Sequence, residues 1–288
     1  MNSEVIPGFP NDAHLRIWQR YLREQLRAIS DQPEQEARWL IAATLNLDPA
    51  AQLCAQERAV SATDAQQLQQ LLAQRLDGLP LAYCLREWSF YGHDLEVDAS
   101  VLIPRPDTEL LVSLALDGTD PNDALQILDL GTGSGAIALT LSLARPRATV
   151  FAVERSPAAL QLARRNAVKL GASVQWREGD WYAALEQGLT FDQIVSNPPY
   201  LASHDPHLPD LRHEPQEALV AGPTGLECLE RIITDAWPRL RPGGRIMLEH
   251  GVAQGPAVRA LLQNAGLGQV ETHTDIAGRE RVSGATRI

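Results

Sequence analysis

A glycine-rich turn between an apolar run and a helical pattern is the feature that most constrains the fold of this chain. Residues 128–130 (Leu-Asp-Leu) lead directly into the turn, and residues 136–139 (Ala-Ile-Ala-Leu) begin a helix. A strand, a turn and a helix in this order direct main-chain N–H groups toward a ligand beside a parallel sheet. Glycine suits such a turn because a side chain would block the approach of the ligand. The turn predicted to bind a cofactor consists of Gly131, Thr132, Gly133, Ser134 and Gly135.

Strand and helix patterns alternate from about residue 107 onward. Near-continuous apolar runs occur at 125–130, 148–153, 191–196 and 245–249, as expected of parallel strands buried on both faces. After the second run, Ser156-Pro157 favours the start of a helix and Gly171 favours its end. The alternation predicts an α/β fold with a doubly wound sheet in a domain spanning 107–288.

The first part of the chain has a helical pattern instead. Apolar residues recur there at steps of three and four, which places them on one helical face: Leu15, Trp18, Leu22, Leu26 and Ile29. Such stripes are typical of helices packed in a core, so we expect a small N-terminal helical bundle domain at 1–84.

A segment of different character separates these two regions. Residues 85–106 contain two short extended runs around Gly92, followed by prolines at 104 and 106. The prolines bar a helix until Asp107, which can act as a helix cap. This segment is predicted to be a hairpin linker between the domains.

Three side chains after the next two strands extend the predicted cofactor site. Glu154 ends the second strand run, where a carboxylate can accept hydrogen bonds from both hydroxyls of a ribose. Asp180 and Trp181 follow a further predicted strand, which lies between the runs 148–153 and 191–196, and there the acid can accept from an exocyclic amine and the indole can pack near an adenine. We expect all three to bind an adenosine-containing cofactor.

The sequence Asn197-Pro198-Pro199-Tyr200 points to the reaction. It follows a buried strand directly, so it lies at the carboxyl edge where open α/β sheets bind ligands. The Asn197 side chain and the Pro198 main chain offer two carbonyl acceptors for one planar NH2 group. The prolines limit the entropy lost on ordering the loop, and Tyr200 offers a face for a planar substrate. We expect Asn197, Pro198 and Tyr200 to serve catalysis, and all four residues to bind the substrate.

Composition and charge exclude several classes of protein. The chain has 36 acidic and 25 basic residues, a formal charge of -11, which does not favour direct binding to nucleic acid. Three scattered cysteines form no metal-binding pair and favour a reducing, cytoplasmic location. The N-terminus lacks a secretory pattern, and no apolar stretch reaches the length of a membrane span, so no membrane association is expected.

These motifs together resemble the class I amino-methyltransferases, and most closely the release factor glutamine methyltransferases (the HemK/PrmC family). The helical domain, the hairpin linker and the run from Val101 to Glu109 are also similar, so the resemblance covers nearly the whole chain. It implies a Rossmann-like class I methyltransferase sheet and S-adenosylmethionine (AdoMet) as cofactor. It also implies transfer of a methyl group to the side-chain amide nitrogen (N5) of glutamine in the GGQ motif of class one peptide chain release factors. The resemblance assigns Asn197 to both ligands, because its motif contacts AdoMet and the glutamine.

Two alternative functions remain open from the sequence alone. The glycine turn also satisfies G-x-G-x-x-A, the pattern of NAD-binding enzymes. A DNA adenine N6-methyltransferase would share both the turn and the Asn-Pro-Pro-Tyr motif, because adenine also has a planar NH2 group. The segment 201–225 is rich in His, Asp and Pro; its spacing matches no zinc pattern, so we expect a lid beside the substrate and no metal.

Overall fold

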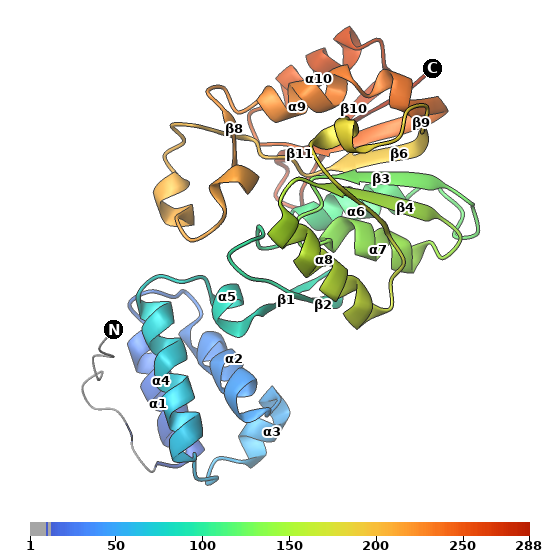
Figure 1. Ribbon diagram of the computed structural model, residues 1–288. Helices are drawn as coiled ribbons and strands as arrows, with labels where there is room; N and C mark the ends of the chain where they lie inside the picture. Colours follow the sequence, from blue (N-terminus) through green and yellow to red (C-terminus); the bar gives the residue numbers. More distant parts are fainter. Residues whose placement is uncertain (1–9, 11–12) are drawn as a thin grey trace. The chain divides into compact units, whose positions relative to one another are not determined.

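The computed structural model describes residues 10 and 13–288, and the chain forms two compact units that divide between Arg86 and Glu87 (Figure 1). The N-terminal unit is helical and the C-terminal unit contains the large sheet. Most of the segment expected to be a linker, 85–106, lies in the C-terminal unit. No helix among these described residues has the length and hydropathy needed to cross a membrane.

Helices packed around one apolar core build the N-terminal unit. In the described part of this unit they are α1 (Leu15–Leu26), α2 (Pro33–Leu45), α3 (Pro49–Cys54), α4 (Ala62–Leu76) and α5 (Leu81–Leu85). Leu15, Trp18, Leu22 and Leu26 are fully buried, as their spacing predicts. The prediction for Ile29 is wrong: α1 has ended before it, and Ile29 is exposed.

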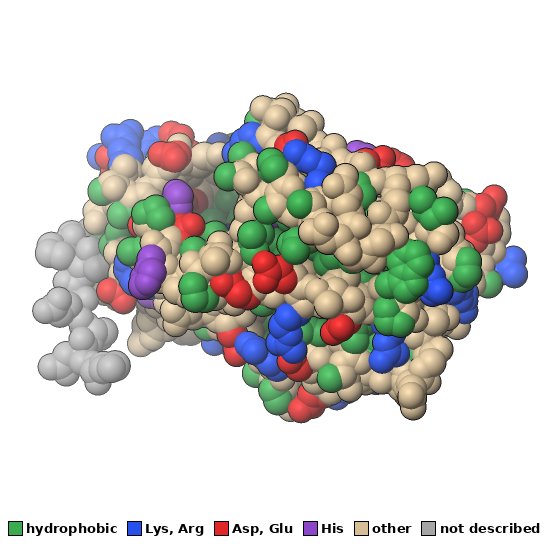
Figure 2. All heavy atoms as spheres, turned by 90° about the horizontal axis from the view of Figure 1, so that it is seen from above, with side chains coloured by type: hydrophobic (Ala, Val, Ile, Leu, Met, Phe, Trp, Pro, Cys, Tyr) green, Lys and Arg blue, Asp and Glu red, His purple; other side chains and the backbone are tan. Residues whose placement is uncertain are grey.

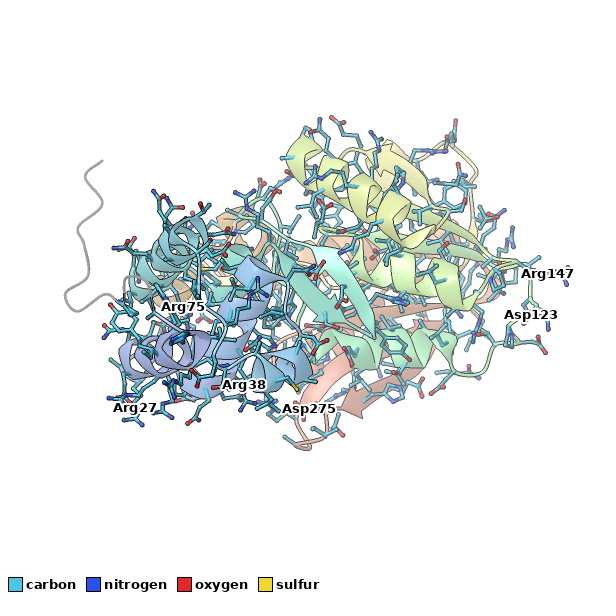
Figure 3. The ribbon with its side chains drawn as sticks, turned by 90° about the horizontal axis from the view of Figure 1, so that it is seen from below. Arg27, Arg38, Arg75, Asp123, Arg147 and Asp275 are labelled. Carbon is cyan, nitrogen blue, oxygen red and sulfur yellow. The ribbon has the colours of Figure 1, made fainter. Side chains whose placement is uncertain are left out.

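Polar contacts fix the ends and the packing of these helices. Ser61 caps α4 by accepting a hydrogen bond from the main-chain nitrogen of Asp64. Arg75 of α4, labelled in Figure 3, donates from Nε to Glu36 of α2 over 2.9 Å in a largely buried ion pair. The ion pair joins α2 and α4, whose buried apolar residues contribute to the core of this unit.

The C-terminal unit follows the predicted alternation. It begins with a hairpin of β1 (Glu87–Phe90) and β2 (His93–Glu96), and then contains α6 (Thr108–Leu116), β3 (Gln126–Leu130), α7 (Ala136–Ala144), β4 (Thr149–Glu154), α8 (Pro157–Leu170), β5 (Gln175–Glu178), β6 (Phe191–Ser196), β7 (Leu201–Ala202), β8 (Val220–Gly222), α9 (Glu227–Thr234), β9 (Leu240–Glu249), α10 (Gly255–Asn264), β10 (Gly268–Thr274) and β11 (Glu280–Thr286). Short 3-10 turns occur at Trp181–Ala184, Leu208–Leu211, Gln216–Ala218 and Trp237–Arg239. Ser156 caps α8 and Gly171 ends it, as predicted.

The central sheet is doubly wound, which confirms the predicted fold class. Its strand order is β10-β11-β9-β6-β3-β4-β5; β9, β6, β3, β4 and β5 are parallel, and β11 and β10 join in antiparallel fashion. Apolar residues of α9 and α10 cover one face, and those of α6, α7 and α8 cover the other (Figure 1). The order reverses between β3 and β6, the position where such sheets bind ligands.

One local prediction, the capping role of Asp107, is wrong in its mechanism. Helix α6 begins at Thr108 with Asp107 at the cap position, but the carboxylate makes no capping hydrogen bond. It lies 2.9 Å from Nη2 of Arg281 on β11 instead. The ion pair joins the start of α6 to β11 of the central sheet.

Candidate active site

Two neighbouring cavities lie at the carboxyl edge of the sheet within the C-terminal unit. The first, of about 260 Å³, is lined by the glycine turn after β3, by the ends of β4, β5 and β6, and by the start of α9. The second, of about 290 Å³, is lined mainly by apolar side chains around Pro198 and Tyr200. Four residues line both cavities: Leu102, Arg105, Asn197 and Ala218. The two spaces therefore share one wall.

The glycine turn forms the floor of the first cavity. Gly133 has φ of +55°, and a Cβ atom built there would meet no atom within 4 Å, so its main chain is open to the cavity. Gly135 has φ of +86°, and a Cβ there would lie 2.9 Å from Leu139. The turn is anchored from below, because the Thr132 hydroxyl donates to the buried Asp129 over 2.6 Å. Burial raises the pKa of Asp129 to about 7.

Glu154 closes the turn from the neighbouring strand. Its Oε2 accepts a hydrogen bond from the nitrogen of Gly133 over 2.9 Å, and its Oε1 accepts from the nitrogen of Ser156 over 2.8 Å. Each carboxylate oxygen has a second lone pair, and Glu154 lines the cavity. The carboxylate is therefore held in place with acceptor capacity left for hydroxyl groups of a ligand.

Asp180 and Trp181 form the side of the first cavity beyond β5. Trp181 has φ of +47°, an uncommon conformation, and its ring lies 3.2 Å from the position of a Cβ atom built on Gly131. Asp180 lines the cavity, but its Oδ2 also lies 2.6 Å from Nη2 of Arg231 on α9. One oxygen of Asp180 is thus engaged with the protein, a contact that the sequence did not reveal.

Asn197 and the residues after it stand directly at the end of β6. Asn197 and Pro199 line the first cavity, and Asn197, Pro198 and Tyr200 line the second. The Nδ2 atom of Asn197 donates to the Oγ1 atom of Thr108 over 3.0 Å. The structure thus brings the residues expected to act on the substrate to the edge of the expected cofactor pocket.

A buried acid behind Tyr200 was not predicted from the sequence. The Tyr200 hydroxyl donates to Oε1 of Glu249 over 3.5 Å, and Glu249 is only 1% exposed. Burial raises the pKa of Glu249 to about 7, while hydrogen bonding from Thr108 and the charge of Arg281 oppose the increase. Glu249 ends an apolar strand, a position from which sequence alone cannot tell that its side chain turns toward Tyr200.

The segment expected to be a lid contributes to both cavities. Glu217 and Ala218 line the first, and His207, Leu211 and Ala218 line the second. Its histidines do not build a metal site: in the described part of the chain, 10 and 13–288, no three His, Cys, Asp or Glu side chains are grouped to hold an ion.

Known proteins resemble this chain over both units. Residues 106–213 match the family described as methyltransferase small domain, and residues 18–85 match the PrmC N-terminal domain. The release factor glutamine methyltransferase of Bordetella pertussis is 47% identical over 265 residues, which cover 91% of this chain and 98% of that protein. The same enzyme of Burkholderia pseudomallei is 49% identical over 222 residues, covering 74% of this chain and 78% of that protein.

Solved structures agree with the fold. A methyltransferase from Pyrococcus furiosus superposes with a TM-score of 0.54 at 19% identity, covering 75% of this chain and 96% of that one. The 16S rRNA N2 G1207 methyltransferase of Thermus thermophilus gives a TM-score of 0.55 at 23% identity, with 70% and 50% covered. These two structural similarities support the fold assigned to the C-terminal unit. The relatives found by sequence identify the family. By its sequence over nearly its full length, the chain belongs to the family of release factor glutamine methyltransferases.

Proposed function

We propose that this protein transfers a methyl group from AdoMet to the side-chain amide nitrogen N5 of the glutamine in the GGQ motif of class one peptide chain release factors. The observation that carries the proposal is the position of Asn197, which lines the wall shared by the two cavities. A residue there can touch a methyl donor on one side and an amide on the other.

The first cavity has the donor and acceptor groups that AdoMet requires. The open main chain at Gly133 suits the close approach of a ligand, and the Glu154 carboxylate can accept hydrogen bonds from ribose hydroxyls. Asp180 has one oxygen outside its contact with Arg231 that can accept from an adenine amine. When bound, AdoMet supplies an electrophilic methyl group on a positively charged sulfur.

Asn197 and Pro198 make a planar amide reactive by holding its NH2 group. An amide nitrogen is a poor nucleophile because its lone pair is delocalised into the carbonyl group. Two carbonyl acceptors on its two N–H bonds can hold the nitrogen with its lone pair directed at the methyl carbon. The N–H groups become more acidic as the new N–C bond forms, so these hydrogen bonds strengthen toward the transition state. The methyl carbon exchanges its bond to sulfur for the bond to nitrogen, which leaves a neutral thioether as the leaving group. The nitrogen then releases one proton to bulk water and remains part of a neutral amide.

Apolar side chains around the second cavity exclude water from this step. Leu102, Leu201, Leu211 and Leu219 line it together with the ring of Tyr200, against which a planar amide can stack. A dry surrounding strengthens the hydrogen bonds from the amide to Asn197 and Pro198.

The helical N-terminal domain, 1–84 in our assignment, is proposed to recognise the release factor. It forms a compact unit with its own core, and neither cavity includes any of its residues. The unit contributes no residue to the two cavities but offers additional protein surface, as expected of a domain that recognises a partner protein. The segment 85–106 would then connect recognition to the catalytic domain at 107–288.

DNA is the less favoured substrate. The formal charge of -11 opposes binding to a phosphate backbone. On the face seen in Figure 2, among the residues drawn in colour, Lys and Arg side chains stand in small groups beside Asp and Glu and form no continuous basic strip.

Mass spectrometry of a release factor incubated with the protein and AdoMet tests the proposal. We expect the GGQ-containing peptide to gain the mass of one methyl group in place of hydrogen, and an adenine-containing DNA duplex in the same buffer to gain none. Methylation of the duplex with an unchanged peptide would contradict the proposal, and so would tight binding of NAD without binding of AdoMet in calorimetry.

A further inference from the structure

The side chain of Asn197 can be useful to a substrate amide only in one of its two orientations. An asparagine amide presents a carbonyl oxygen on one side and an NH2 group on the other, and the two ends have almost the same shape. A substrate NH2 group needs the oxygen. Something in the protein must therefore hold the Asn197 amide against a rotation that would present its own NH2 group.

Thr108 provides a hydrogen-bond acceptor for the NH2 end. Its Oγ1 accepts from Nδ2 of Asn197 over 3.0 Å, and Thr108 is only 4% exposed. The main-chain nitrogen of Thr108 donates to the carbonyl oxygen of Arg105 over 3.1 Å, which fixes the start of α6. The hydroxyl thus stands at a defined place beside Asn197, on a largely buried residue that also lines the first cavity.

A threonine hydroxyl can also donate, so the position of its single proton decides which end of Asn197 it attracts. Glu249 is the group placed to set that position. Ser196 pairs with Leu248 in the register of β6 and β9, so Asn197, the first residue after β6, lies beside Glu249, the last residue of β9. The Thr108 hydroxyl interacts with the buried carboxyl of Glu249, whose Oε2 has no hydrogen-bond partner within 3.5 Å in the described part of the chain. When ionised, this carboxylate can only accept hydrogen bonds, so it would draw the proton of the Thr108 hydroxyl toward itself and leave a lone pair of that hydroxyl facing Asn197.

We infer that Thr108 and Glu249 are positioning residues, which hold the Asn197 amide with its NH2 group inward and its Oδ1 toward the substrate amide. This inference rests on the proposed function, because it assigns the two residues a role in that same reaction. According to this inference, neither residue touches the substrate, and both act through Asn197. Tyr200, which donates to the same carboxyl from the other side, is held by the same acid.

Thr108→Val is the decisive substitution, because valine keeps the shape of threonine and lacks the hydroxyl. We expect the single-turnover rate at saturating release factor and saturating AdoMet to fall by about 10- to 100-fold. Because Thr108 also lines the first cavity, the dissociation constant of AdoMet is measured alongside and is expected to change much less than the rate. Thr108→Ser keeps the hydroxyl and is expected to retain most of the rate. Thr140→Val is the matched control, since Thr140 is also a buried helical threonine and its hydroxyl donates only to the carbonyl oxygen of Ala136.

A spectroscopic measurement separates this inference from the proposed function. In protein labelled with 15N at asparagine, the side-chain NH2 signals of Asn197 are identified by their loss in Asn197→Ala. We expect them to shift and to exchange faster with water in Thr108→Val, and to stay as in the parent in Thr108→Ser and Thr140→Val. Unchanged signals in Thr108→Val, or an unchanged rate, would overturn the inference. If the parent protein left the release factor unmethylated, the proposed function would fail, and the signals of Asn197 would still decide whether Thr108 holds the amide.

Discussion

The guanidinium of Arg105 donates from Nη2 to Oε1 of Glu214 over 2.5 Å, and this ion pair joins two distant segments of the chain. The other oxygen of Glu214 accepts from the nitrogen of Ile103 over 3.1 Å. A single carboxylate, 4% exposed in its side chain, therefore fastens the segment after Tyr200 to the proline-rich segment before α6. Both segments line the second cavity.

Replacing Glu214 by Gln should loosen the segment 203–219. The charge of Arg105 would lose its partner, and removing one member of a buried pair typically costs about 3–5 kcal/mol. Because the side chain of Arg105 is 34% exposed, we expect a smaller effect. The free energy needed to open the segment 203–219 locally should fall by about 1–2 kcal/mol. Faster hydrogen exchange over 203–219 would show it. Glu217→Gln is the control, since its pair with Arg155 is exposed on both sides and should leave exchange unchanged.

Glu154→Ala should weaken AdoMet binding by about 10- to 100-fold, since a hydrogen bond to a charged group contributes about 1.5–3 kcal/mol. The variant removes acceptors for the ribose and also frees Gly133, whose nitrogen is held by Glu154. Titration calorimetry measures the change. Glu178 ends the adjacent strand β5 in register with Glu154 and does not line the cavity, so Glu178→Gln should bind AdoMet like the parent. Equal dissociation constants for Glu154→Ala and the parent would refute the role of Glu154.

Asn197→Ala should lower the rate of methyl transfer far more than it weakens AdoMet binding. The loss of one preorganised hydrogen-bond partner of the transition state costs on the order of 10²–10³ in rate. Asn197→Asp keeps an acceptor but adds a charge and alters how the amide is held, so we expect it to be impaired as well. Single-turnover rates decide the matter. Rates for both variants within about threefold of the parent would make Asn197 an ordinary loop residue.

The stability of the C-terminal unit should depend on the protonation of Glu249. Burial raises the pKa of this carboxyl from 4.5 to about 7, so the folded state holds the proton more tightly than the unfolded chain does. Its contribution to the free energy of unfolding therefore falls as the pH rises from about 4.5 to about 7. The glutamine of Glu249→Gln does not titrate. The free energy of unfolding of this variant, relative to that of the parent, should therefore rise by about 1–3 kcal/mol between pH 5 and pH 8.

Hydrogen exchange of the β9 amides at the two pH values measures that gain. Groups that face Glu249 from other elements are Tyr200, Asp107 and Arg281, and they are present in both proteins. The buried Asp129, whose pKa is also raised to about 7, likewise cancels in the comparison. Glu230→Gln removes an exposed acid of α9 and should show no pH-dependent difference. A constant difference between Glu249→Gln and the parent would contradict the assignment.

A chain that lacks the helical unit should bind AdoMet and methylate the intact release factor poorly. Both cavities are built within the C-terminal unit, so AdoMet affinity should be preserved in residues 87–288. Calorimetry with AdoMet first establishes that the shortened protein is folded, and the rate with intact factor is then compared with the rate of the full chain. Full activity of the shortened protein would exclude a recognition role for the helices.

Much of the fold could be predicted because its signals are local in sequence. The strands β3, β4, β6 and β9 each contain a near-continuous apolar run, and Ser156 and Gly171 mark the limits of α8. The antiparallel strands β10 and β11 carry no such signal. Residues of β10, such as Glu271, Thr272 and His273, are largely polar, as suits an edge strand that is only partly buried.

Those residues of the candidate site that are adjacent to one another in the sequence could be predicted. The glycine turn and Asn197 to Tyr200 follow their strands directly, so sequence order already indicates their position. Thr108, Glu214 and Glu249 lie far from these motifs in the sequence and reach the site only through packing and strand register. Side-chain orientation also escaped prediction: Asp107 turned from its expected cap to Arg281.

The wall shared by the two cavities has a consequence for how two ligands bind. Since Leu102, Arg105, Asn197 and Ala218 face both spaces, a ligand that shifts these side chains in one cavity alters the affinity of the other. Thermodynamic linkage makes such an effect reciprocal: the factor by which the first ligand changes the affinity for the second equals the factor in the opposite direction. If the methyl donor occupies the first cavity and the acceptor the second, coupling between them would run through these four side chains, and an acceptor peptide that tightens the binding of the donor must itself be bound more tightly when the donor is present.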